Sequence, residues 1–257
     1  HLSIRRQRQM CIRDRGLVAL NALWFPTGVA LTGQGVIPLS SNWLDVFGQA
    51  GSMSQNLGLG FEGPADPWAW VLAIISAPLF FEPSLAITIL LYLATAIAFT
   101  GFFALSALVT RSNPVRITGS LAFALWPALT ISVTETRFAQ VLAIALLPWL
   151  AHSLAKIAQL GISNPGSFVS RWSQVGLSGI LLALVAASSP ALGLTIVLLI
   201  VALGATRPKK LPALLFTTGL TVIWFVPIAL ERLALGAPLA VLMDPGVAVA
   251  SLSLIHI

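Results

Sequence analysis

The stretch SLAITILLYLATAIAFTGFFALSALV, residues 84–109, decides the fold class. It has no charged side chain and exceeds the roughly 20 residues that span a hydrocarbon core. In lipid every backbone N–H and C=O must be satisfied internally, so a segment this long without two-residue alternation is predicted to be a helix. Hydrophobic residues make up 57% of the chain and charged residues 9%, against roughly 45–50% and about 25% in soluble domains. The chain is therefore predicted to be an integral membrane protein.

Further apolar runs lie on both sides of this stretch. We predict an all-α, polytopic transmembrane helical bundle of about seven spans plus one re-entrant or interfacial helix. The run 67–81 is the candidate for that extra helix, because Trp68 and Trp70 mark its leading edge. A pair of short spans over residues 67–109 is the alternative. The other runs are 17–31, 67–81, 117–133, 138–155, 175–188, 191–205 and 213–230.

The two ends of the chain are predicted to be foreign to it. The segments MCIRDR, residues 10–15, and LSLIHI, residues 252–257, can be encoded by reverse-complementary DNA. Chance does not make two termini complementary, and the pair resembles a translated sequencing adapter at both ends of one insert. We therefore treat residues 1–15 and 252–257 as non-native tails, and 16–251 as a transmembrane domain that is a fragment of a longer protein.

Excluding the tails changes the charge balance. They contain five of the 14 basic and one of the eight acidic residues, so the formal charge falls from +6 to +2. A basic arm over Arg5–Arg15 that binds membrane or nucleic acid is the alternative interpretation of the first tail. The only cysteine, Cys11, is also in a tail. The remaining sequence predicts no disulfide, no Cys/His metal site, no cofactor and no nucleic-acid partner.

The distribution of charge predicts the orientation. The connections 110–116, 156–172 and 207–210 contain seven of the nine native cations, which makes them cytoplasmic by the positive-inside rule. The segment 34–66, the turn 134–137, the Ser189–Pro190 turn and the residues after 230 are then on the outer side.

Candidate functional residues lie in the predicted outer segments. The loop 33–67 contains three acids, Asp45, Glu62 and Asp66, and long ordered loops tend to be functional. A solvated connector is the alternative. In the short turn, Arg137 beside Glu135 is a candidate for binding a lipid phosphate, since the guanidinium fork suits that group. A local Glu135–Arg137 ion pair that caps two helices is the other interpretation.

Tryptophan and proline recur together, as in Trp126–Pro127 and Pro148–Trp149. Kinked helices that pack against each other are favoured over a sugar- or cofactor-stacking role. His152, the only native histidine, is interpreted as an interfacial residue, with a catalytic role as the alternative. No ionisable residue lies in the middle of a predicted span, which argues against an ion-coupled transporter. Nucleotide-binding, zinc-protease and serine-hydrolase motifs are also missing.

The order of these features resembles a known family. The segments are GLGFEGPADPW (58–68), LAFALWPAL (121–129), VLAIALLPWLA (141–151) and MDPG (243–246). Together they resemble the membrane half, of GT-C-like kind, of large actinobacterial family-2 glycosyltransferases. The resemblance implies a multi-pass protein of the bacterial plasma membrane that takes part in cell-envelope biogenesis.

The resemblance also implies a reaction and roles for the outer residues. It implies sugar transfer from or to a polyprenyl-phosphate carrier or glycolipid, with a divalent metal only in the full-length protein. An acid of the first outer loop would act as base. By position Asp45 is the first candidate, followed by Asp66 and Glu62, with Arg137 and Glu135 at the phosphate. Two alternatives stay open: a carrier or flippase for a lipid-linked glycan, and a non-catalytic membrane scaffold for a cytosolic transferase domain.

Overall fold

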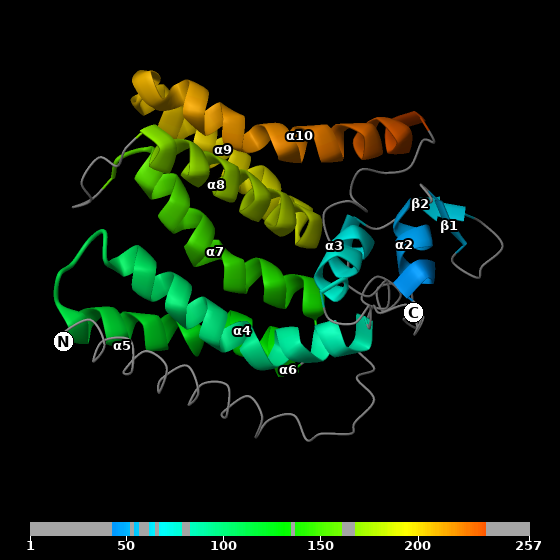
Figure 1. Ribbon diagram of the computed structural model, residues 1–257, viewed down its shortest axis with the longest axis horizontal. Coiled ribbons are helices and arrows are strands. Elements are labelled where there is room, and N and C mark those ends of the chain that lie inside the picture. Colours follow the sequence, from blue (N-terminus) through cyan, green and yellow to red (C-terminus); the bar gives the residue numbers. More distant parts are fainter. Residues whose placement is uncertain are drawn as a thin grey trace, which may run out of the picture.

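A computed structural model describes residues 43–51, 54–56, 62–64, 67–78, 83–134, 137–160 and 168–234. Within these ranges the chain is a bundle of helices with one short β-hairpin (Figure 1). The predicted helical fold is therefore confirmed, while the predicted run 17–31 and both predicted tails lie outside the described residues. The elements are α2 (Trp43–Gly51), β1 (Ser54–Asn56), β2 (Glu62–Pro64), α3 (Pro67–Ser76), α4 (Pro83–Ser106), α5 (Asn113–Ala124), α6 (Pro127–Thr134), α7 (Phe138–Ile157), α8 (Phe168–Ser188), α9 (Pro190–Thr206), η1 (Pro208–Lys210) and α10 (Leu211–Ala234).

Four helical segments of the described residues are long and apolar enough to cross a membrane. Two more apolar helices are shorter and lie within α8 and α9. This length and composition agree with the predicted membrane character of the chain. The four segments are Leu85–Ser106, Asn113–Thr134, Phe138–Ile157 and Pro208–Val226.

The predicted run 117–133 is two helices in the structure, because Pro127 has no N–H to continue the first one. Helix α5 ends at Ala124, and the Trp126 N–H donates to the Phe123 carbonyl in a tighter turn before α6 begins. Helix α5 also begins at Asn113, inside a connection predicted to be a loop. Proline in its first turn explains that early start, since the first turn needs no N–H donors.

The predicted outer loop 33–67 is not irregular where it is described. It contains α2 and an antiparallel pair in which Asn56 of β1 is opposite Glu62 of β2. The assignment of this segment as a loop is therefore wrong for these residues. Helix α10 likewise continues through residue 231, so Glu231 lies on a helix rather than after one.

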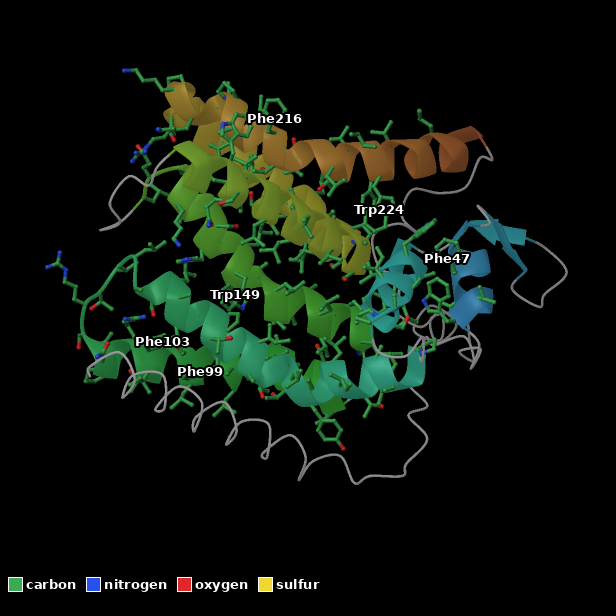
Figure 2. The ribbon with its side chains drawn as sticks, viewed as in Figure 1. Phe47, Phe99, Phe103, Trp149, Phe216 and Trp224 are labelled. Carbon is green, nitrogen blue, oxygen red and sulfur yellow. The ribbon has the colours of Figure 1, made fainter. Side chains whose placement is uncertain are left out.

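Helices α4 and α7 pack closely at the centre of the bundle, and Figure 2 shows Trp149 between their ribbons. The Trp149 Nε1–H donates a hydrogen bond of 3.0 Å to the Ile97 carbonyl oxygen. A Cβ atom on Gly101 would lie 2.6 Å from Trp149 Cδ1, so only glycine accommodates the indole there. Small residues permit such close approach between apolar helices. The packing interpretation of Pro148–Trp149 agrees with these contacts.

Helices α8, α9 and α10 form the second half of the bundle. The Ser189–Pro190 turn joins α8 and α9 into a hairpin, in which a Cβ atom on Gly193 would lie 2.7 Å from Ala186 Cα. Leu182, Ile200 and Leu214, one from each helix, belong to a single buried cluster that also includes α7 residues. Helix α7 therefore connects the two halves.

The elements define two ends of the bundle. The α4–α5 connection, the end of α7, the start of α8 and η1 lie at the left of Figure 1, and we call this the basic end. Helices α2 and α3, the β-hairpin and the end of α10 lie at the right, and we call this the hairpin end. The described parts of the three connections predicted to be cytoplasmic thus lie at one end. The cations on the basic end are Arg111, Arg116, Lys156, Arg171, Arg207, Lys209 and Lys210.

Candidate functional site at the hairpin end

Helix α2 is held against α3 by aromatic contacts. The Trp43 Nε1–H donates a hydrogen bond of 3.0 Å to the Ala73 carbonyl. The Trp43 and Phe47 rings stack with centroids 5.2 Å apart, and the Phe47 ring meets the edge of Trp70 at 5.4 Å. Figure 2 shows Phe47 on α2 beside α3. These contacts fix a helix of only nine residues, which is too short to be stable alone.

The same helix also reaches the core of the bundle. Val46 is 3% exposed and belongs to the buried cluster that contains Leu72 of α3, Leu129 of α6 and Phe138 of α7. Four elements far apart in sequence therefore share one apolar core at the hairpin end. The backbone of Asp45, next to Val46, is positioned by that core.

Arg137 stands at the turn between α6 and α7. Its backbone N–H donates to the Ser132 carbonyl at 2.9 Å, and its own carbonyl accepts from the Val141 N–H at 2.9 Å. Its side chain is half-buried. Phe138, the next residue after Arg137, packs into the same buried cluster as Val46 of α2. The start of α7 and helix α2 are therefore positioned by one cluster. The side chain most suited to a phosphate is thus at the same end as α2.

The five predicted site residues fare differently. Asp45 lies on α2 and Glu62 on β2, where the structure describes the backbone of each. Asp66 and Glu135 lie outside the described residues. The structure therefore brings the backbone positions of Asp45 and Glu62 and the residue Arg137 to one end of the bundle. In the part of the chain that is described, three or more His, Cys, Asp or Glu side chains nowhere gather to hold a metal ion.

Sequence reasoning missed the aromatic support of this site. Trp43, Phe47 and Trp70 hold α2 against α3, and of these only Trp70 was predicted to have a role, as an interfacial residue of the run 67–81. The spacing of four residues between Trp43 and Phe47 was the available signal, since it places both rings on one helical face.

His152 lies in the second half of α7, towards the basic end. It is half-buried on α7, one turn before the exposed Lys156, and interacts with the backbone of Ala104 on α4. Its Nδ1 atom is buried and has no hydrogen-bond partner among the described residues. The ring packs between two helices, away from the hairpin end, so it takes no part in the candidate site.

Comparison with protein-family models, with curated proteins and with solved structures gave no match to this chain.

Proposed function

We propose that this chain is the membrane domain of a cell-envelope glycosyltransferase that uses a polyprenyl-phosphate-linked sugar or acceptor at the outer face. The observation that carries the proposal is the gathering of α2, β2 and the start of α7 at the hairpin end, opposite the basic end. These elements bear Asp45, Glu62 and Arg137. By the positive-inside rule the hairpin end is then the outer one.

The proposed topology has seven spans in the bacterial plasma membrane. They are the run 17–31, α4, α5 with α6, α7, α8, α9 and α10. Helix α3 is the interfacial or re-entrant helix of this arrangement. Its ten residues reach only about 15 Å at about 1.5 Å per residue, half of a hydrocarbon core of roughly 30 Å.

The proposed chemistry is direct transfer between a lipid carrier and a hydroxyl group. The acceptor oxygen bonds to the anomeric carbon of the sugar while the bond from that carbon to the carrier phosphate oxygen breaks. A carboxylate, first Asp45 and then Asp66 or Glu62, accepts the hydroxyl proton. Arg137, with Glu135 beside it in sequence, balances charge on the departing lipid phosphate. Each role needs only a side chain at the outer face.

The test is Asp45→Asn in the native protein, which keeps the size of the side chain and removes its basicity. Sugar transfer in membrane vesicles is expected to fall about 10²–10⁴-fold, the usual contribution of a general base. Glu231→Gln is the matched control, because it neutralises another acid of the hairpin end, on α10. The control is expected to retain activity.

Other outcomes would contradict the proposal at different levels. If Asp45→Asn keeps full activity, Glu62 or Asp66 becomes the candidate base. These two are tested by Glu62→Gln and Asp66→Asn. If all three variants transfer sugar normally, catalysis at the outer face is wrong. If the purified protein moves lipid-linked glycan across vesicles without altering it, the carrier interpretation replaces the enzyme.

A further inference from the structure

The basic end carries positive charge, while the acidic residues that the structure describes lie at the hairpin end. Its three connections, 110–116, 156–172 and 207–210, contain seven cations and no aspartate or glutamate. The acids on described residues are Asp45, Glu62 and Glu231, and they lie on α2, β2 and the last turn of α10, all at the hairpin end. The positive charge of the basic end is therefore not balanced by acidic side chains of the described residues.

Two arginines of the basic end are fixed in position by backbone carbonyls. Arg116 donates from Nη2 to the Phe103 carbonyl at 2.9 Å, and its guanidinium carbon lies 3.8 Å from the Phe103 ring centroid. Arg207 donates from Nη1 to the Ala158 carbonyl at 3.4 Å. These carbonyls belong to the last turn of α4 and to the turn after α7, where the helix dipole favours a cation. Carbonyl partners therefore hold both guanidinium groups in place.

The Arg207 contact brings two distant segments together. It joins residues 49 apart in sequence and sets η1 against the end of α7. Lys156 lies two residues before Ala158, while Lys209 and Lys210 follow Arg207 on η1. Lys156, Arg207 and Lys209 are exposed, and Lys210 is half-buried. Four cations from two segments thus lie within two or three residues along the chain of this contact, and we call them the η1 cluster.

The η1 cluster lies at the boundary of apolar segments. One candidate span, Pro208–Val226, begins on η1 itself, and another, Phe138–Ile157, includes Lys156 in its last turn. Cations at the end of an embedded apolar helix lie at the depth of the lipid headgroups. The position of this cluster therefore favours a lipid over a soluble partner.

We propose that the η1 cluster, formed by Lys156, Arg207, Lys209 and Lys210, binds the phosphate groups of anionic phospholipids in the leaflet around it. This rests on the membrane embedding proposed above and adds a second lipid contact, at the end opposite the candidate site. The guanidinium of Arg207 suits the paired oxygens of a phosphodiester, and the three lysines act as point charges around it. Each cation near an anionic lipid surface strengthens the attraction.

The test measures which lipids surround the purified protein. The chain is reconstituted in nanodiscs with equal amounts of phosphatidylglycerol and phosphatidylcholine, and the lipids that stay bound on detergent extraction are counted by native mass spectrometry. Phosphatidylglycerol is expected to be enriched, and the triple variant Arg207→Gln, Lys209→Gln, Lys210→Gln to lose about fivefold of that enrichment per cation. Both leaflets of a nanodisc have the same composition, so an inverted orientation of the variant does not affect the result.

Two controls separate this site from general charge and from misfolding. Arg232→Gln removes one cation from the hairpin end and is expected to leave the enrichment unchanged. Lys209→Arg with Lys210→Arg keeps the charge and is expected to retain it. If circular dichroism shows that the triple variant loses helix, the double variant Lys209→Gln, Lys210→Gln replaces it.

Three results would overturn the proposal. The first is an equal lipid ratio around the wild-type chain and the glutamine variants, and the second is an equal loss in Arg232→Gln. The third is an enrichment that does not weaken as salt is raised, because attraction between exposed charges is screened. The readout is lipid composition, so it succeeds or fails independently of sugar transfer.

Discussion

Helices α4 and α10 are equal in length, at 24 residues each, and both are strongly apolar. Their surroundings nevertheless differ. In the candidate span of α4, 56% of the residues are buried inside the protein, against 22% in the span that contains most of α10. Phe216 and Ile223 of α10 are exposed, whereas Leu91 and Ala98 of α4 are covered. Hydrophobicity thus determines which helices suit a membrane, and other properties determine which of them form the core.

Those other properties are the size and shape of the side chains at the helix contacts. Between apolar helices in lipid there is little hydrophobic driving force, so association depends on close packing and on a few hydrogen bonds. Helix α4 offers Gly101, which accepts the Trp149 ring, and the Ile97 carbonyl, which accepts its N–H. Gly219 of α10 has no atom within 4 Å of the position that a Cβ would take. Glycine is therefore a packing site in one helix and open surface in the other.

The largest expected difference between the two helices comes from removing a buried side chain. Leu91 is 1% exposed and Leu220 is 45% exposed. Leu91→Ala leaves a cavity in the core and is expected to cost about 2–5 kcal/mol of unfolding free energy. Leu220→Ala shortens an exposed side chain and is expected to change the unfolding free energy by less than about 0.5 kcal/mol. Denaturant titration of the purified protein in detergent measures both. Equal losses would show that α10 is as tightly packed as α4.

The next difference is in the sign of the stability change when a glycine is replaced by alanine. Gly101→Ala forces a methyl group against the Trp149 ring and is expected to destabilise the protein by about 1–3 kcal/mol. Gly219→Ala meets open space in a helix interior and is expected to stabilise it by up to about 1 kcal/mol. Thermal unfolding in the same detergent compares the two midpoints. A stabilising Gly101→Ala would contradict the close approach of α4 and α7.

The smallest difference concerns the two Trp–Pro pairs. Trp149→Phe removes the N–H bonded to the Ile97 carbonyl and is expected to cost about 0.5–1.5 kcal/mol. The cost stays modest because the Thr100 hydroxyl also donates to that carbonyl, at 3.0 Å. Trp126 is 59% exposed at the break between α5 and α6, so Trp126→Phe is expected to have little effect. Thermal unfolding again gives the comparison, and similar shifts for both variants would remove the distinction between the pairs.

Long apolar runs predicted the helices well, since one property, hydropathy, marks them without reference to the rest of the chain. The run 138–155 corresponds to helix Phe138–Ile157, and the run 191–205 to Pro190–Thr206. The Trp126–Pro127 pair was interpreted as a kink within the run 117–133, whereas the structure ends one helix there and begins another, because proline cannot donate in a helix. The early start of α8, at Phe168, was not, because polar residues in its first turns end the apolar run.

The candidate site was less accessible to sequence reasoning. The short helix α2 depends on the bond from Trp43 to Ala73, thirty residues away, and a contact of that kind has no local signature. The hairpin strands of three residues are too short for a periodic pattern. The side of the bundle on which Arg137 lies was predictable, because the charges of the connections fix the direction of each helix in turn.

The α8–α9 hairpin has a further consequence, for the thickness of the surrounding membrane. The 17 residues of α9 reach about 26 Å and the 24 residues of α4 about 36 Å, at about 1.5 Å per residue. In the proposed topology α9 is thus shorter than a typical hydrocarbon core, while α4 is longer than one. Lipid with shorter acyl chains matches the length of α9, while a tilt of α4 accommodates its excess length. The bilayer would then have to thin next to α9 and not along the whole perimeter of the protein.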